Sequence, residues 1–167
     1  MCFVIAVAML VWAIGASAVE ARAAEVSDEL KSAIVAKCDN VKENLVTLQH
    51  NDSRTRVYLG RKYEEILMNY VTPLNVALVG KSLSTIGIID NQNNLVAARD
   101  NFVVDYLEYQ KGLEELVNMD CKKEPGKFYD KLVIVRAKRK IVADDVTKMR
   151  RLTMENGELV KELKEEL

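Results

Sequence analysis

The last third of the chain carries apolar residues at an alternating spacing of four and three. The pattern starts at Phe128 and continues without interruption for about forty residues, which is typical of one long helix that packs along other helices. It predicts an elongated helical bundle and argues against a pocketed enzyme. The positions of this seam are Phe128, Leu132, Val135, Arg139, Val142, Val146, Met149, Thr153, Asn156, Val160, Leu163 and Leu167.

Two earlier segments show the same spacing. One starts at Ile34 and slips by one position after Leu59, and Pro73 predicts a kink or interruption near its end. The other extends from Ile88 to Met119. We therefore predict an all-α fold, an elongated antiparallel three-helix bundle or coiled coil. The first stripe consists of Ile34, Cys38, Val41, Leu45, Leu48, Asp52, Thr55 and Leu59, then Tyr63, Ile66, Tyr70, Leu74 and Ala77.

Glycines, prolines and small polar residues mark the connections at 80–90 and 120–126. Short connections make neighbouring helices antiparallel. Folding the second and third helices about residue 122 also sets Asp105 opposite Arg139, the one charged residue of the third seam, so we expect an ion pair there. The predicted apolar layers are Leu116 with Phe128, Tyr109 with Val135, Phe102 with Val142, and Leu95 with Met149.

The first nineteen residues carry no charged side chain, and small residues with A-x-A sites at 16–18 and 21–23 follow the apolar stretch. This order is typical of a secretory signal peptide, although no Lys or Arg precedes the apolar run. An uncleaved membrane anchor at 1–19 is the alternative. The sequence thus predicts a leader or N-terminal anchor at 1–23 and a helical bundle at 24–167. The expected location is secreted or extracytoplasmic, at a cell surface or in a periplasm.

Removal of the leader would leave two cysteines, Cys38 and Cys121, a number that suits one disulfide in an oxidising compartment. Two inert buried thiols are the alternative. Straight helices that turn near residue 84 would place Cys121 opposite residue 48, roughly 15 Å from Cys38. A break near Pro73 would bring the two cysteines together, as would a chain that passes the end of the bundle after Met119.

Motifs for catalysis or cofactor binding are weak. Gly80-Lys81-Ser82 matches the end of a phosphate-binding loop, but Asn75 stands where the first glycine belongs. Neighbouring carboxylates such as Glu114 and Glu115 point about 100° apart on a helix, and the single histidine, His50, has no cysteine nearby in sequence. We therefore expect no enzyme activity, no metal and no cofactor.

A basic cluster on the third helix is the one candidate binding surface. Arg136, Lys138 and Lys140 could bind an anionic polymer or small ligand, although a solvated face paired with acids explains them as well. The net charge of −1 gives no general attraction to nucleic acid. We expect a non-enzymatic cell-surface or envelope interaction or structural protein, with a protein partner or self-association. An extracytoplasmic binding protein for a small or anionic polymeric ligand is the alternative.

Several short segments resemble those of a known group of sequences. They are Cys38, Leu48-Gln49, the segment 52–60, Tyr63, Thr72-Pro73-Leu74-Asn75, Asp120-Cys121, Phe128-Tyr129 and the cluster 136–140. On these residues the chain resembles uncharacterised exported helical-bundle (coiled-coil) proteins of reduced-genome candidate-phylum bacteria. The resemblance extends from Glu25 to Leu163. It implies export, an all-helical fold and paired cysteines, and it supplies no catalytic residues.

Overall fold

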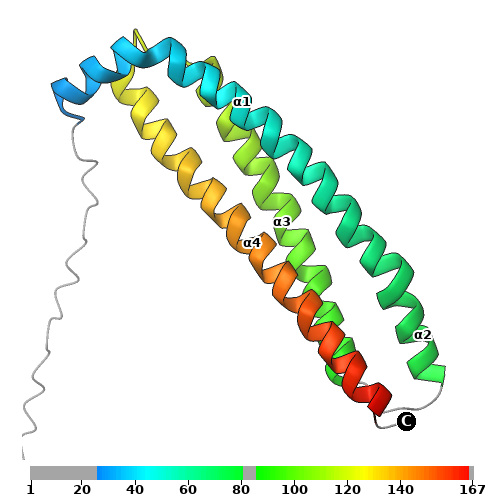
Figure 1. The fold of residues 1–167 in the computed structure, drawn as a ribbon. Helices are drawn as coiled ribbons and strands as arrows, with labels where there is room; N and C mark the ends of the chain where they lie inside the picture. The colour runs from blue at the N-terminus through cyan, green and yellow to red at the C-terminus, as the bar shows by residue number, and fades with distance from the viewer. Residues whose placement is uncertain (1–25, 81–85, 166–167) are drawn as a thin grey trace, which may run out of the picture.

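The computed structural model describes residues 26–80 and 86–165. These residues form three long helical rods packed together and no strands, so the predicted all-α bundle is confirmed (Figure 1). The first rod is continuous and combines three elements. The elements in chain order are α1 (Asp28–Ile66), the π-helical turn η1 (Leu67–Val71), α2 (Thr72–Gly80), α3 (Ile86–Asn118) and α4 (Pro125–Glu165).

Helices α3 and α4 form a closely packed antiparallel hairpin. Their heptad positions supply most of the core, including Leu95, Tyr109, Leu116, Phe128 and Met149, each about 1% exposed or less. Burying this apolar surface is the main stabilising contribution to the hairpin. The two predicted seams are therefore confirmed as the faces that α3 and α4 bury.

The register of this hairpin differs from the predicted one. The side chain of Val135 lies 3.3 Å from the place a Cβ at Gly112 would occupy, so Val135 packs against Gly112, one turn closer to the tip than its predicted partner Tyr109. The point midway between residues 112 and 135 falls between 123 and 124, slightly beyond the predicted turn at 122. The reason is the turn itself, because Asp120 accepts backbone hydrogen bonds from Lys122 and Lys123 at 3.0 and 3.2 Å.

The irregularity predicted at Pro73 takes the form of a π-helical turn. The Thr72 hydroxyl donates to the Leu67 carbonyl at 2.9 Å, within the turn that precedes the proline. A π turn accommodates an extra residue and rotates the helix face that follows. Leu67, Val71 and Leu78 are buried as a result, whereas Tyr70 is 65% exposed. The predicted stripe through Tyr70 and Ala77 is therefore wrong by one position.

A disulfide joins Cys38 of α1 to Cys121 at the hairpin tip, with the Cα atoms 5.7 Å apart. The first turns of α1 lie over this tip, where Lys122 pairs with Asp39 at 2.7 Å. The predicted bridge is present. The contacts of Tyr109 with Asp52 and of Tyr106 with Ser53 show the same register of α1 on α3, so the displacement of α1 along α3, compared with a turn at residue 84, brings Cys38 to Cys121.

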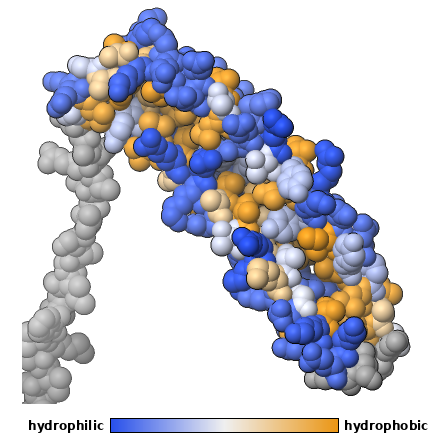
Figure 2. All heavy atoms as spheres, in the orientation of Figure 1, coloured by the Kyte–Doolittle hydropathy of each residue, from blue (hydrophilic) through white to orange (hydrophobic). Residues whose placement is uncertain are grey.

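Hydrophilic and apolar residues alternate over the surface in Figure 2, and an apolar patch gathers at the end where α2 lies. Within 26–80 and 86–165, no helix combines the length and apolarity needed to cross a bilayer. The predicted leader or anchor at 1–23 lies outside the described residues, as does most of the first connection, 81–85.

Candidate ligand-binding cavity

A cavity of about 350 Å³ lies between the three rods. It forms because α1 packs less closely on the hairpin than α3 and α4 pack on each other. Its size lies within the range of small-molecule sites. The lining residues are Asp52, Thr55, Arg56 and Leu59 from α1, Phe102, Tyr106 and Tyr109 from α3, and Arg136, Arg139, Lys140, Val142, Ala143 and Val146 from α4.

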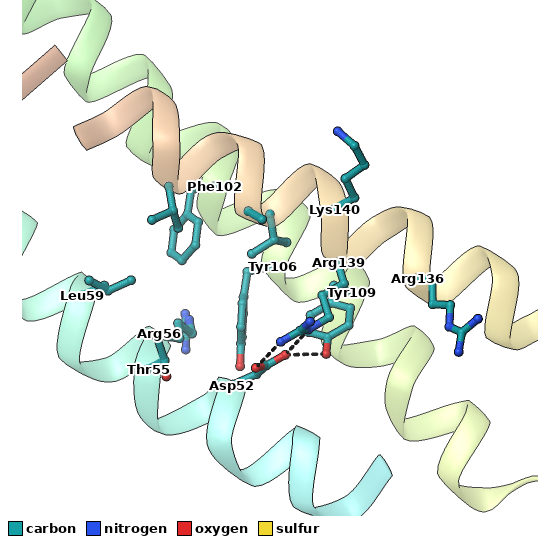
Figure 3. A pocket seen from close by; sticks show the side chains of 13 residues that line it. Asp52, Thr55, Arg56, Leu59, Phe102, Tyr106, Tyr109, Arg136, Arg139 and Lys140 are labelled. Atoms are coloured by element: carbon teal, nitrogen blue, oxygen red, sulfur yellow. Dashed lines mark hydrogen bonds and ion pairs between the residues drawn. The ribbon is translucent and has the colours of Figure 1, made fainter. Parts of the chain in front are cut away.

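A polar junction at one end of the cavity connects all three rods. The Tyr109 hydroxyl donates to Asp52 Oδ2 at 2.7 Å, and Arg139 donates to the same carboxylate through Nε at 2.8 Å and Nη2 at 3.1 Å (Figure 3). Planar two-point pairing of this kind is the strongest ion-pair geometry available to arginine. It fixes the position of α1 against both helices of the hairpin.

The junction shifts the titration of its own members. Burial raises the pKa of Asp52, but the hydrogen bonds from Arg139 and Tyr109, together with the charge of Arg139, outweigh burial and leave the pKa below its usual value of 3.8. Burial and the hydrogen bond to the Asp52 carboxylate raise the pKa of the Tyr109 phenol. Asp52 is therefore an anion at neutral pH, while Tyr109 stays a hydrogen-bond donor.

Aromatic side chains of α3 form the floor of the cavity. Phe102, Tyr106 and Tyr109 are all buried, and the rings of Tyr106 and Tyr109 meet edge to face with centroids 6.1 Å apart. The guanidinium of Arg56 lies over the Tyr106 ring, 4.8 Å from its centroid. A cation in this position is stabilised by the ring and keeps its N–H donors free for a ligand.

The structure divides the basic cluster that was predicted as a binding surface. Arg136 and Lys140 line the cavity, although the Lys140 amine points away from α1 and pairs with Asp144 at 2.7 Å. Lys138 lies on the other side of α4 and pairs with Glu108 at 2.9 Å. The cavity lining therefore includes two of the three residues predicted as a binding surface.

Sequence analysis missed the contribution of α1 and the role of Arg139 in the site. Asp52, Thr55 and Arg139 all occupy seam positions in the heptad pattern, where apolar residues are the rule. Polar residues at such positions need polar partners on the facing helix. This signal was present in the sequence and could have linked Asp52 to Arg139.

The predicted ion pair between Asp105 and Arg139 is wrong. Arg139 pairs with Asp52, because its position on α4 faces α1 and the shifted hairpin register moves it away from Asp105. Asp105 instead neighbours Asp145, where burial, with the hydrogen bond and charge of Asp105, raises the pKa of Asp145. Two carboxylates so placed repel each other when both are ionised.

The lining of the cavity combines cationic, aromatic and apolar side chains. In the described part of the chain, no three His, Cys, Asp or Glu side chains gather in a way that could hold a metal ion. His50 lies outside the cavity lining, and both described cysteines are in the disulfide. Comparisons with protein-family models, curated proteins and solved structures give no match. The argument for function therefore depends on the site itself.

Proposed function

We propose that this protein is a non-enzymatic, extracytoplasmic binding protein that holds an anionic ligand in the cavity between α1, α3 and α4. The observation that supports this is the imbalance of charge, because four cationic side chains line the cavity and Asp52 is its one carboxylate. Among the described residues, Arg56 and Arg136 form no ion pair with a carboxylate. Unpaired arginines beside an aromatic floor favour an anion with an apolar part.

A fluorescent aromatic sulfonate, 8-anilinonaphthalene-1-sulfonate, tests the proposal directly. Its neutral analogue N-phenyl-1-naphthylamine has the same ring system without the charge. We expect Arg136→Gln to weaken binding of the sulfonate severalfold and to leave the neutral probe unchanged, because one charge-assisted contact is lost. Added salt should weaken sulfonate binding in the same selective way.

Lys138→Gln is the matched control, since it removes a neighbouring positive charge that lies outside the cavity. It should leave the affinity for both probes unchanged. Equal losses for Arg136→Gln and Lys138→Gln would indicate a general surface field and would contradict the proposed site. Failure of the sulfonate to bind at all would contradict it as well.

Export is part of the proposal and is supported by the disulfide, because such bonds persist in oxidising compartments. The uncharged N-terminal stretch and the resemblance to exported helical-bundle proteins point the same way. Intact mass measurement of the native protein tests this. Cleavage after Ala18 or Ala23 would remove Trp12, the one tryptophan of the chain, whereas its retention would indicate an anchor.

A structural or interaction role by self-association is the second candidate. It is favoured by the uncharged segment 66–80, where Met68, Tyr70, Val76 and Val79 are each more than half exposed. Such a surface is typical of a contact with another protein or a second copy. Sedimentation velocity across a concentration series tests it, with Val76→Lys/Val79→Lys as the variant that should abolish any association.

A further inference from the structure

The lining of the cavity changes from charged to apolar along its length. Six residues of α4 line the cavity, in the order Arg136, Arg139, Lys140, Val142, Ala143 and Val146, and they span ten positions. At 1.5 Å per residue this is about 15 Å. Along α4 the lining therefore changes from cationic to apolar.

The other two walls change in the same direction. On α1 the lining begins with Asp52 and ends with Leu59, and the guanidinium of Arg56 lies between them, over the Tyr106 ring. On the antiparallel α3 the lining begins with the hydroxyl of Tyr109 and ends with Phe102. The bond between Asp52 and Tyr109 places both polar residues at the Arg139 end. Apart from Arg56, the lining residues of the three helices agree on which end is polar.

The polar end retains donors that the protein does not use. Arg139 donates hydrogen bonds to Asp52 through Nε and Nη2, and its Nη1 group donates to no other residue among those described. The exposed Arg136 side chain lies one turn along α4 from Arg139 and forms no ion pair within the described residues (Figure 3). One anionic group can therefore be bound at this end without breaking the junction at Asp52.

We propose that the ligand is an amphiphile with one anionic head group at Arg136 and Arg139 and a single alkyl tail directed toward Leu59, Phe102 and Val146. This inference deepens the proposed function and rests on it. The head group, a carboxylate or a phosphate monoester, gives orientation through charge-assisted hydrogen bonds. The tail gives affinity, because it transfers apolar surface from water into the cavity.

A series of straight-chain carboxylates from acetate to tetradecanoate tests the proposal by displacement of the fluorescent sulfonate, with every acid kept below its micelle-forming concentration. Each methylene that enters the cavity should increase the affinity about fourfold. The increase should level off once the chain exceeds the roughly 15 Å of lining. The matched alkyl phosphates distinguish the two head groups. The matched n-alcohols and alkylammonium salts should bind at least tenfold more weakly, because they lack the anion.

Val146→Phe fills the apolar end and should weaken dodecanoate at least tenfold while leaving acetate and butanoate unchanged. Ile141→Phe is the matched control, because it adds the same ring on α4 at a half-exposed position outside the lining. Leu59→Phe narrows the same end of the cavity from the facing wall. It provides the same test of dodecanoate binding if Val146→Phe does not fold. Circular dichroism and the thermal midpoint confirm that each variant is folded.

The outcomes separate this inference from the proposed function. If the sulfonate binds through Arg136 but the affinity of the carboxylates does not depend on chain length, the amphiphile is wrong and anion binding stands. If alcohols bind as tightly as the acids, the head-group assignment is wrong. If neither the sulfonate nor any carboxylate binds, both proposals fail.

Discussion

At the scale of single residues, the junction of Asp52, Tyr109 and Arg139 determines how α1 sits on the hairpin. Replacement of Arg139 by Leu removes two hydrogen bonds to a carboxylate that is only 20% exposed. We expect a loss of about 1–2 kcal/mol in unfolding free energy, since Tyr109 still satisfies one oxygen of Asp52. The double variant Asp52→Leu/Arg139→Leu should recover part of this loss. Urea denaturation at pH 7 measures both, and Asp105→Ala should add to Arg139→Leu without coupling.

The same junction predicts a dependence on pH. The folded pKa of Asp52 is depressed below 3.8, so the folded state holds its charge more strongly than the unfolded state. The stabilisation is complete above pH 3.8 and is lost as the pH falls through the lowered folded pKa. The difference in stability between the wild type and Arg139→Leu should therefore be constant near neutrality and decrease only below pH 3.8.

The pKa of Asp145, which lies beside Asp105, is shifted in the opposite direction to that of Asp52. The folded pKa of Asp145 is raised, so ionisation near neutrality costs stability, and this cost disappears once the group is protonated. One Asp145 oxygen is also buried without a hydrogen-bond partner. We expect Asp145→Asn to raise the thermal midpoint at pH 7, by an amount that decreases as the pH falls toward 3.8. An equal gain at pH 7 and pH 4 would show that repulsion between the carboxylates is not the cause.

At the scale of elements, two glycines inside helices provide a matched pair. A Cβ at Gly60 of α1 would meet nothing within 4 Å, whereas one at Gly112 of α3 would lie 3.3 Å from Val135. Gly60→Ala should stabilise the protein by about 1 kcal/mol through helix propensity. Gly112→Ala gains the same propensity but crowds the hairpin interface, so it should stabilise less or destabilise. Equal effects in thermal unfolding would contradict the observed hairpin register.

The helices could be predicted from sequence because a heptad pattern is local and survives any sliding of one helix along another. The register between the helices could not be predicted, because the same pattern is satisfied at several positions as one helix slides along another. The pattern does not reveal that Asp120 lengthens the tip, that a π turn precedes Pro73, or that Cys121 faces Cys38 and not residue 48. The cavity depends on all three registers at once, so its location could not be predicted, although Arg136 and Lys140 of its lining were identified as candidate binding residues.

At the scale of the whole molecule, the disulfide connects residues 83 positions apart. Closing a loop of this length should stabilise the protein by about 4.5 kcal/mol in the chain-entropy model. We therefore expect Cys38→Ser/Cys121→Ser to lose most of that amount in urea denaturation relative to the oxidised wild type. Non-reducing peptide mapping of the native protein checks the bond itself. Free thiols at both positions, or a bridge between two chains, would contradict the intramolecular pairing.

The bond between Cys38 and Cys121 also makes the segment between them a covalent ring. Two walls of the cavity, from α1 and α3, belong to this ring, and the third wall, α4, follows it in the chain. A single protease cut anywhere in the ring would release no fragment, because the two new ends stay linked through sulfur. A nicked molecule would therefore keep its three walls together until a reductant reaches the disulfide.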